Sequence, residues 1–176
     1  MKIHCRLIRT VLWSCLLIQL VFFILAWGSL QPHIGPVWIR LAAKGLEFDA
    51  LLALPLERRL LGAALGLPAL LAMAYGLWRL DRMLLNVERG AMFAATTIAH
   101  LHAFAGATLV ATLLSMAETP LRAILFRLLL DAPGRGTPVG VNSEELMLML
   151  LCGLFYLITR MLHEGRRLLE ENEGFV

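Results

Sequence analysis

The chain has 176 residues, of which 59% are hydrophobic and only 16% are charged, and its mean hydropathy is +0.75. This composition excludes a water-soluble domain, which carries about a quarter charged residues, and the length indicates a single domain, surrounded by the lipid bilayer. The apolar runs along the chain predict an all-α bundle of four transmembrane helices with short interfacial helices. The net charge of +3 does not indicate direct nucleic-acid binding, because Lys and Arg lie at the edges of the apolar runs, where lipid headgroups attract them.

The first predicted span covers residues 11–30, a run of 20 residues without a charge. At about 1.5 Å per residue, such a helix is long enough to cross a hydrocarbon core of about 30 Å. A basic segment precedes the run, as in a secretory signal peptide, but the run exceeds the roughly 7–15 apolar residues of such a peptide. We therefore expect the segment to remain as a membrane anchor.

The first predicted loop covers residues 31–59 and opens with prolines and a glycine, which end the preceding helix. Within this loop, residues 37–48 mix apolar and charged side chains, which favours a short helix lying in the membrane interface. An irregular loop fits equally well, because Gly45 weakens a helix.

The second predicted span covers residues 60–80, with Arg79 near its end as its only charge. Pro68 removes one backbone donor in the middle of the span and predicts a kink. Gly62 and Gly66 are four residues apart, a spacing that lets another helix approach closely. We interpret this pair as a helix-packing site rather than as a dimer motif.

The third predicted span covers residues 98–117 and follows a polar connection at residues 82–90. Small residues recur at every fourth position along this span, so consecutive members share one face and allow close packing. We expect Ala103, Ala107 and Ala111 to form such a packing face and this helix to be the central one.

Glu118 and Pro120 are predicted to end the third span. The next ten residues, 121–130, are too short and too charged for another span, so we expect them to form an outer interfacial helix. An ionisable residue in a membrane span is by default a functional candidate. At a helix end, however, Glu118 is better explained as an interfacial partner of Arg122, four residues later.

The fourth predicted span covers residues 146–162, and Asn142 with Glu145 resembles a capping box at its start. Residues 163–176 continue this helix as a charged cytoplasmic tail. Four spans place both termini on one side of the membrane, and nine Lys and Arg lie on that side against seven on the other. The positive-inside rule therefore favours cytoplasmic termini.

The sequence predicts no catalytic, cofactor or metal site. The three cysteines, Cys5, Cys15 and Cys152, are too scattered for a disulfide framework or a metal site. His100 and His102 are spaced i,i+2, so they should point to nearly opposite sides of a helix and cannot bind one ion together. The spans contain no carboxylate pair, nucleophile elbow or phosphate-binding glycine loop. We therefore expect a non-enzymatic protein.

The segment from Trp78 to Leu109 resembles the connection of the bacterial membrane family of unknown function DUF 2975. Gly90 and Phe93 match one family motif, and Leu101 with Gly106 approximates a second. The ending of the chain resembles the family ending at Glu164, Leu168, Glu170, Glu171, Asn172, Phe175 and Val176. Two positions depart from the family pattern, since Ala94 replaces a threonine and His102 replaces an arginine. The resemblance covers about residues 75–176.

This resemblance implies a bacterial inner-membrane protein of four helices without an assigned activity. Members are often encoded beside small helix-turn-helix regulators, which implies a soluble cytoplasmic regulator as a partner. A docking surface for it would comprise Gly90, Phe93, Arg166, Arg167, Glu170, Glu171, Phe175 and Val176. Two alternatives stay open. The tail can fold back onto the bundle so that Phe175 covers a helix end. The protein can also be a small transporter or channel subunit, including a homo-oligomeric pore.

Overall fold

The computed structural model describes residues 2–28, 33–34, 37–38, 54–91, 94–130 and 143–173. Helix α1 (Lys2–Gly28) comes first, followed by the strands β1 (His33–Ile34) and β2 (Val37–Trp38). Three further helices follow, α3 (Leu56–Glu88), α4 (Ala95–Leu130) and α5 (Ser143–Glu173). Each of the four helices contains a segment long and apolar enough to cross a membrane, namely Cys5–Gly28, Leu56–Glu88, Ala95–Phe126 and Leu146–Gly165. The predicted all-α fold with four membrane helices is thereby confirmed.

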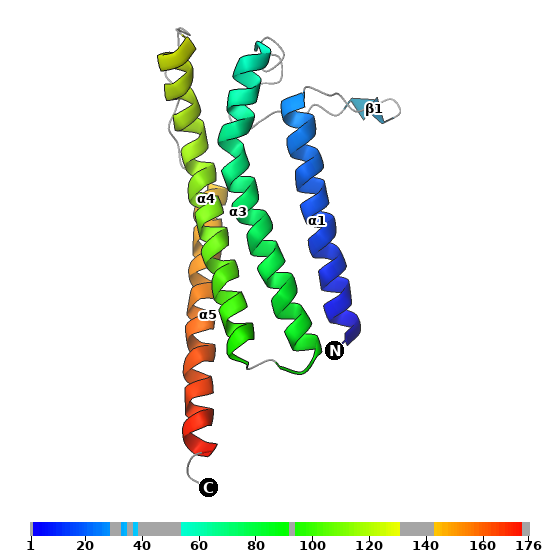
Figure 1. The fold of residues 1–176 in the computed structure, drawn as a ribbon, viewed down its shortest axis with the longest axis vertical. Helices are drawn as coiled ribbons and strands as arrows, with labels where there is room; N and C mark the ends of the chain where they lie inside the picture. The colour runs from blue at the N-terminus through cyan, green and yellow to red at the C-terminus, as the bar shows by residue number, and fades with distance from the viewer. Residues whose placement is uncertain are drawn as a thin grey trace.

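The two short strands pair in an antiparallel hairpin, with His33 opposite Trp38 and Ile34 opposite Val37. This hairpin lies beside the end of α1 (Figure 1). Val37 and Trp38 are extended, so an interfacial helix does not begin at residue 37. Residues 39–53, where the rest of that helix was expected, lie outside the described part of the chain.

The four helices run alongside one another, each roughly antiparallel to the next in the chain (Figure 1). Within the described residues, α1 packs against α3, α3 against α4, and α4 against α5. Helix α4 is the central one, as predicted, because 44% of its most apolar stretch is buried against 11–17% in the other three helices.

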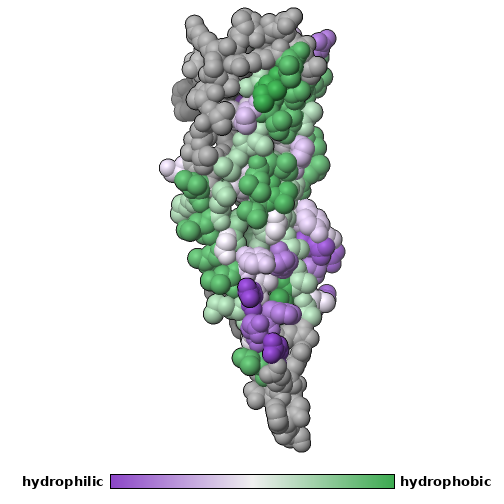
Figure 2. Space-filling model, turned by 90° about the vertical axis from the view of Figure 1, so that its left-hand side faces the viewer, coloured by the Kyte–Doolittle hydropathy of each residue, from purple (hydrophilic) through white to green (hydrophobic). Residues whose placement is uncertain are grey.

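Large apolar side chains cover the outward faces of the helices. Leu17 on α1, Leu71 on α3 and Leu150 on α5 are each more than half exposed. Figure 2 shows this apolar surface along the face formed by α4 and α5, with hydrophilic residues gathered toward the end where α5 terminates. Burying such a surface in hydrocarbon is favourable, so we assign it to contact with lipid.

The helices are longer than the predicted spans, because charged residues that were expected to mark boundaries lie inside them. Helix α1 begins at Lys2 rather than near residue 11, and α3 continues to Glu88, through most of the predicted connection at residues 82–90. The turn that remains between α3 and α4 contains Gly90, whose φ of +85° is a left-handed conformation that favours glycine.

Helix α4 corrects a second expectation, since it continues through Pro120 to Leu130 and no separate interfacial helix follows the proline. Proline removes one backbone hydrogen bond, but a break inside an apolar environment would leave several backbone groups without partners. Continuing the helix is therefore the less costly solution. Helix α3 likewise continues through Pro68 without interruption.

Candidate functional site: two buried ion pairs and an interhelical cavity

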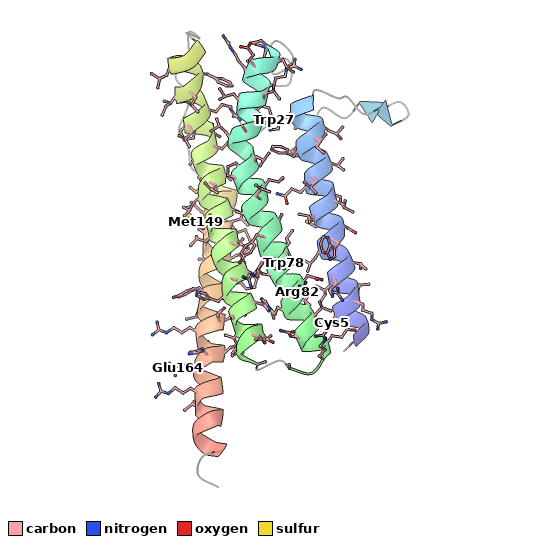
Figure 3. All side chains as sticks on the ribbon, viewed as in Figure 1. Cys5, Trp27, Trp78, Arg82, Met149 and Glu164 are labelled. Atoms are coloured by element: carbon pink, nitrogen blue, oxygen red, sulfur yellow. The ribbon has the colours of Figure 1, made fainter. Side chains whose placement is uncertain are left out.

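The two glycines predicted as a packing site, Gly62 and Gly66, face α1. A Cβ atom added at Gly62 would overlap the indole ring of Trp27. One added at Gly66 would lie 3.1 Å from the ring of Phe23 and 3.5 Å from Glu118 Oε1. Trp27 is only 8% exposed and lies between α1 and α3 (Figure 3). The glycine pair thus receives two aromatic rings from α1.

Replacing Gly62 by Ala is expected to destabilise the protein by about 1–3 kcal/mol, because the added methyl group overpacks the Trp27 ring. The measurement is the free energy of unfolding of the purified protein in mixed detergent micelles. The matched control is Gly106→Ala, since a Cβ atom at Gly106 meets nothing within 4 Å. Equal stability of the two variants would contradict the assignment of Gly62 to this contact.

Two of the alanines predicted as a packing face, Ala103 and Ala107, line one groove beside Ala72 and Tyr75 of α3. A Cβ atom at Gly76 on α3 would lie 3.3 Å from the Ala107 methyl group, so α3 and α4 approach closely there. Ala111 is buried and lines a cavity in the interior, and Ala103 also lines a groove between α4 and α5. A step of four residues advances 40° beyond a full turn, so the row winds around α4. Sequence reasoning did not identify Gly76, which has no second glycine four residues away.

Glu118 and Arg122 form an ion pair inside the protein. Arg122 Nη1 donates to Glu118 Oε1 at 3.1 Å, and the two side chains are only 4% and 12% exposed, the arginine being the more buried. The Arg122 guanidinium also lies 5.8 Å from the centre of the Trp27 ring. The predicted pairing is confirmed, but its predicted position at a helix end is wrong. Helix α4 continues to Leu130, about 18 Å farther at 1.5 Å per residue.

A cavity of about 330 Å³ lies beside this ion pair, with walls from all four helices. Its polar lining consists of Gln19, Thr112, Ser115 and Glu118, and most of the remaining wall is apolar. The Thr112 hydroxyl donates to the Thr108 carbonyl, so its proton is used within its own helix. Arg122 and Glu118 carry opposite charges, so the cavity offers hydrogen-bonding groups beside an ion pair. No cluster of three metal-ligating side chains occurs among the described residues.

A second group of ion pairs joins α1 to α3 at the opposite end of the bundle. Arg9 Nε donates to Asp81 Oδ1 at 2.6 Å, and Arg9 Nη1 lies 3.9 Å from Glu88 Oε2. Arg6 Nε donates to Glu88 Oε1 at 3.3 Å. Asp81 is buried. Sequence reasoning did not identify Asp81, which lies between the predicted span at residues 60–80 and the predicted connection at residues 82–90, although Asp81 and Glu88, seven residues apart, share one helix face.

An aromatic cluster on α3 surrounds Arg79. Arg79 Nε donates to Tyr75 Oη at 2.8 Å, and the Arg79 guanidinium lies 5.4 Å from the centre of the Trp78 ring. Arg82 contacts the same indole at 5.5 Å (Figure 3). Arg79 Nη1 also lies 3.2 Å from His100 Nδ1, which accepts because the guanidinium can only donate.

The two histidines of α4 point apart, as their spacing predicted. His100 faces Arg79 on α3, whereas the His102 ring lies 5.4 Å from the Tyr156 ring on α5. One ion therefore cannot bind both rings.

The structure describes only part of the predicted docking surface. Gly90 is exposed at the α3–α4 turn, and Arg167 is exposed on α5, where its Nη1 lies 3.9 Å from Glu164 Oε2. Phe93, Phe175 and Val176, and the side chains of Arg166, Glu170 and Glu171, lie outside the described residues. The expected capping box at Asn142 and Glu145 does so as well. The α3–α4 turn and the carboxyl-terminal part of α5 lie at the same end of the molecule as the amino terminus (Figure 1).

The family model described as a protein of unknown function (DUF2975) matches residues 37–175. No curated protein and no solved structure matches the chain.

Proposed function

The chain belongs to the DUF2975 family, as its resemblance predicted, and from that premise we propose that it is a non-enzymatic bacterial inner-membrane protein that docks a soluble cytoplasmic regulator. One observation carries this proposal. Helix α5 continues without a break from its apolar segment, which ends at Gly165, to Glu173. It extends past the α3–α4 turn and away from the other helices (Figure 1).

The extension of α5 suits docking because it is a helix continuous with a membrane span. At about 1.5 Å per residue, the eight residues after Gly165 reach roughly 12 Å beyond the apolar segment. Arg167 and Leu168 on this extension are both more than half exposed. A partner would therefore meet charged groups and an apolar side chain on a preformed helix, which reduces the entropy lost on binding. Folding back onto the bundle is less well supported, because the helix leads away from it.

With both termini in the cytoplasm, truncation after Arg167 is expected to abolish the retention of one soluble protein on native membranes. Affinity purification of the intact and truncated chains measures this retention. In parallel, a photo-crosslinking residue at position 168 is expected to capture the same protein, whereas one at position 157, on the membrane segment of α5, is not. Identical partners for the intact and truncated chains would contradict the docking proposal.

A transporter or channel subunit is the second candidate, and the 330 Å³ cavity favours it. Gln19 lines this cavity and makes no side-chain hydrogen bond within the described part of the chain. Reconstitution into liposomes tests this alternative. A solute flux that Gln19→Leu abolishes would favour transport, whereas the docking proposal expects no flux.

A further inference from the structure

A groove between α4 and α5 carries a group of cationic and titratable side chains that the docking proposal does not use. Its volume is about 520 Å³. Helix α4 contributes Ala95, Ile98, Ala99, His102 and Ala103, and α5 contributes Tyr156, Thr159, Arg160 and His163. The α4 side is thus mostly small and apolar, whereas α5 supplies an arginine and an imidazole.

The groove carries a positive charge that no carboxylate balances among the residues that the structure describes. Arg160 and His163 are exposed, and neither forms an ion pair with a carboxylate of the described residues. The nearest acidic residue along α5, Glu164, contacts Arg167 instead. Arg160, His163 and His102 can donate hydrogen bonds, and the Tyr156 hydroxyl can also donate. An anion with several acceptor oxygens, such as a phosphate group, fits this set.

The depth of the groove matches the membrane interface. Ala95 is the first residue of the α4 apolar segment, and Arg160 and His163 lie within the last two turns of the α5 segment, which ends at Gly165. The α5 segment has 20 residues, about the length that crosses a hydrocarbon core, so Arg160 and His163 near its end lie close to the headgroup level. Basic pockets between membrane helices at this level are a known recognition mode for anionic lipid headgroups.

The same cleft continues toward the membrane interior as an apolar space. A second cavity of about 340 Å³ is lined by Ala105, Gly106, Leu109, Met149, Cys152, Gly153 and Tyr156. Tyr156 lines both cavities, so it marks their junction. Cβ atoms added at Gly106 and Gly153 would meet nothing within 4 Å, so the space along the two helices is open. A groove with cationic side chains that continues into an apolar cavity is complementary to a phospholipid, which has a charged headgroup and apolar acyl chains.

We propose that the α4–α5 cleft binds an anionic phospholipid. The headgroup phosphate lies among Arg160, His163 and His102, and an acyl chain lies along Gly106 and Gly153. This inference is independent of the docking proposal, because it concerns the membrane segment of α5 rather than its extension.

The test measures lipid bound to the purified full-length chain by native mass spectrometry in detergent, with phosphatidylglycerol or phosphatidylcholine added. Phosphatidylglycerol is expected to bind more tightly. Arg160→Gln is expected to weaken its binding about fivefold, the effect of one basic residue at an anionic headgroup. Arg167→Gln, which removes the same charge outside the groove, is the matched control and should leave binding unchanged.

A second pair of variants tests the acyl slot. Gly153→Leu fills the open space and is expected to weaken phosphatidylglycerol binding by at least about tenfold, because it displaces several methylene groups. Gly165→Leu is its control, since this glycine also has open space around it but lies outside the cleft. Equal binding of the two lipids, or equal effects of each variant and its control, would overturn the proposal. If Arg160→Gln abolishes phosphatidylglycerol binding and Gly153→Leu leaves it unchanged, the ligand of the groove would be a soluble phosphate compound rather than a phospholipid. Full competition of inorganic phosphate with phosphatidylglycerol would indicate the same.

Discussion

Replacing Glu118 by Met is expected to lower the free energy of unfolding by about 3–5 kcal/mol, the largest effect expected from a single substitution in this protein. Arg122 is 3% exposed and would lose the carboxylate that lies 3.1 Å from its guanidinium. A buried guanidinium without that counter-charge is costly, because the surroundings screen charge poorly. The measurement is reversible unfolding of the purified protein in mixed detergent micelles.

A double-mutant cycle separates the ion pair from general packing. Arg122→Met alone should also be strongly destabilising, because it removes the guanidinium that donates to the largely buried Glu118 carboxylate. The variant with both substitutions should lose much less stability than the sum of the two single losses, since two unbranched apolar side chains can fill the same volume. A double variant whose loss equals that sum would mean that the two charges do not interact in the folded protein.

The second large effect is expected at the opposite end of the bundle, where Asp81→Asn should lower the free energy of unfolding by about 2 kcal/mol. Asp81 is buried and accepts from Arg9 at 2.6 Å, and hydrogen bonds to charged groups are the stronger class. The same unfolding measurement in micelles applies.

Glu88→Gln is the matched control for this prediction. Glu88 lies on the same face of α3 and contacts the same arginine, but at 3.9 Å, and its other partner, Arg6, is mostly exposed. Its replacement should change stability by less than about 1 kcal/mol. If Glu88→Gln is as unstable as Asp81→Asn, the short contact between Asp81 and Arg9 contributes no more to stability than the longer contact of Glu88.

The sequence allowed the number and order of the membrane helices to be predicted, because an apolar run of about 20 residues has few alternatives in a bilayer. The opposite directions of His100 and His102 also followed from helix geometry alone. Both predictions depend only on residues that are close together in the chain.

The helix boundaries and the buried ion pairs could not be predicted in the same way. The predicted second span ended before Asp81, because a carboxylate in a span is costly unless it is paired, and the partner of Asp81, Arg9, is 72 residues away in the chain. Similarly, the spacing of Gly62 and Gly66 predicted a close contact but not that α1 would supply Trp27. Contacts between distant segments decide these features, and local patterns do not report them.

The attachment of the outer helices has a mechanical consequence. Helix α1 is fixed to α3 near both of its ends, by Arg9 and Asp81 at one and by Trp27 against Gly62 at the other, so it cannot pivot against α3 without breaking one of them. Within the described residues, helix α5 packs mainly against α4, beside open spaces at Gly106 and Gly153. A rigid helix transmits tilt as displacement: a tilt of about 10° around Gly153 moves Glu173 sideways by about 5 Å at 1.5 Å per residue. A small tilt of α5 within the membrane would therefore produce a larger displacement of its extension.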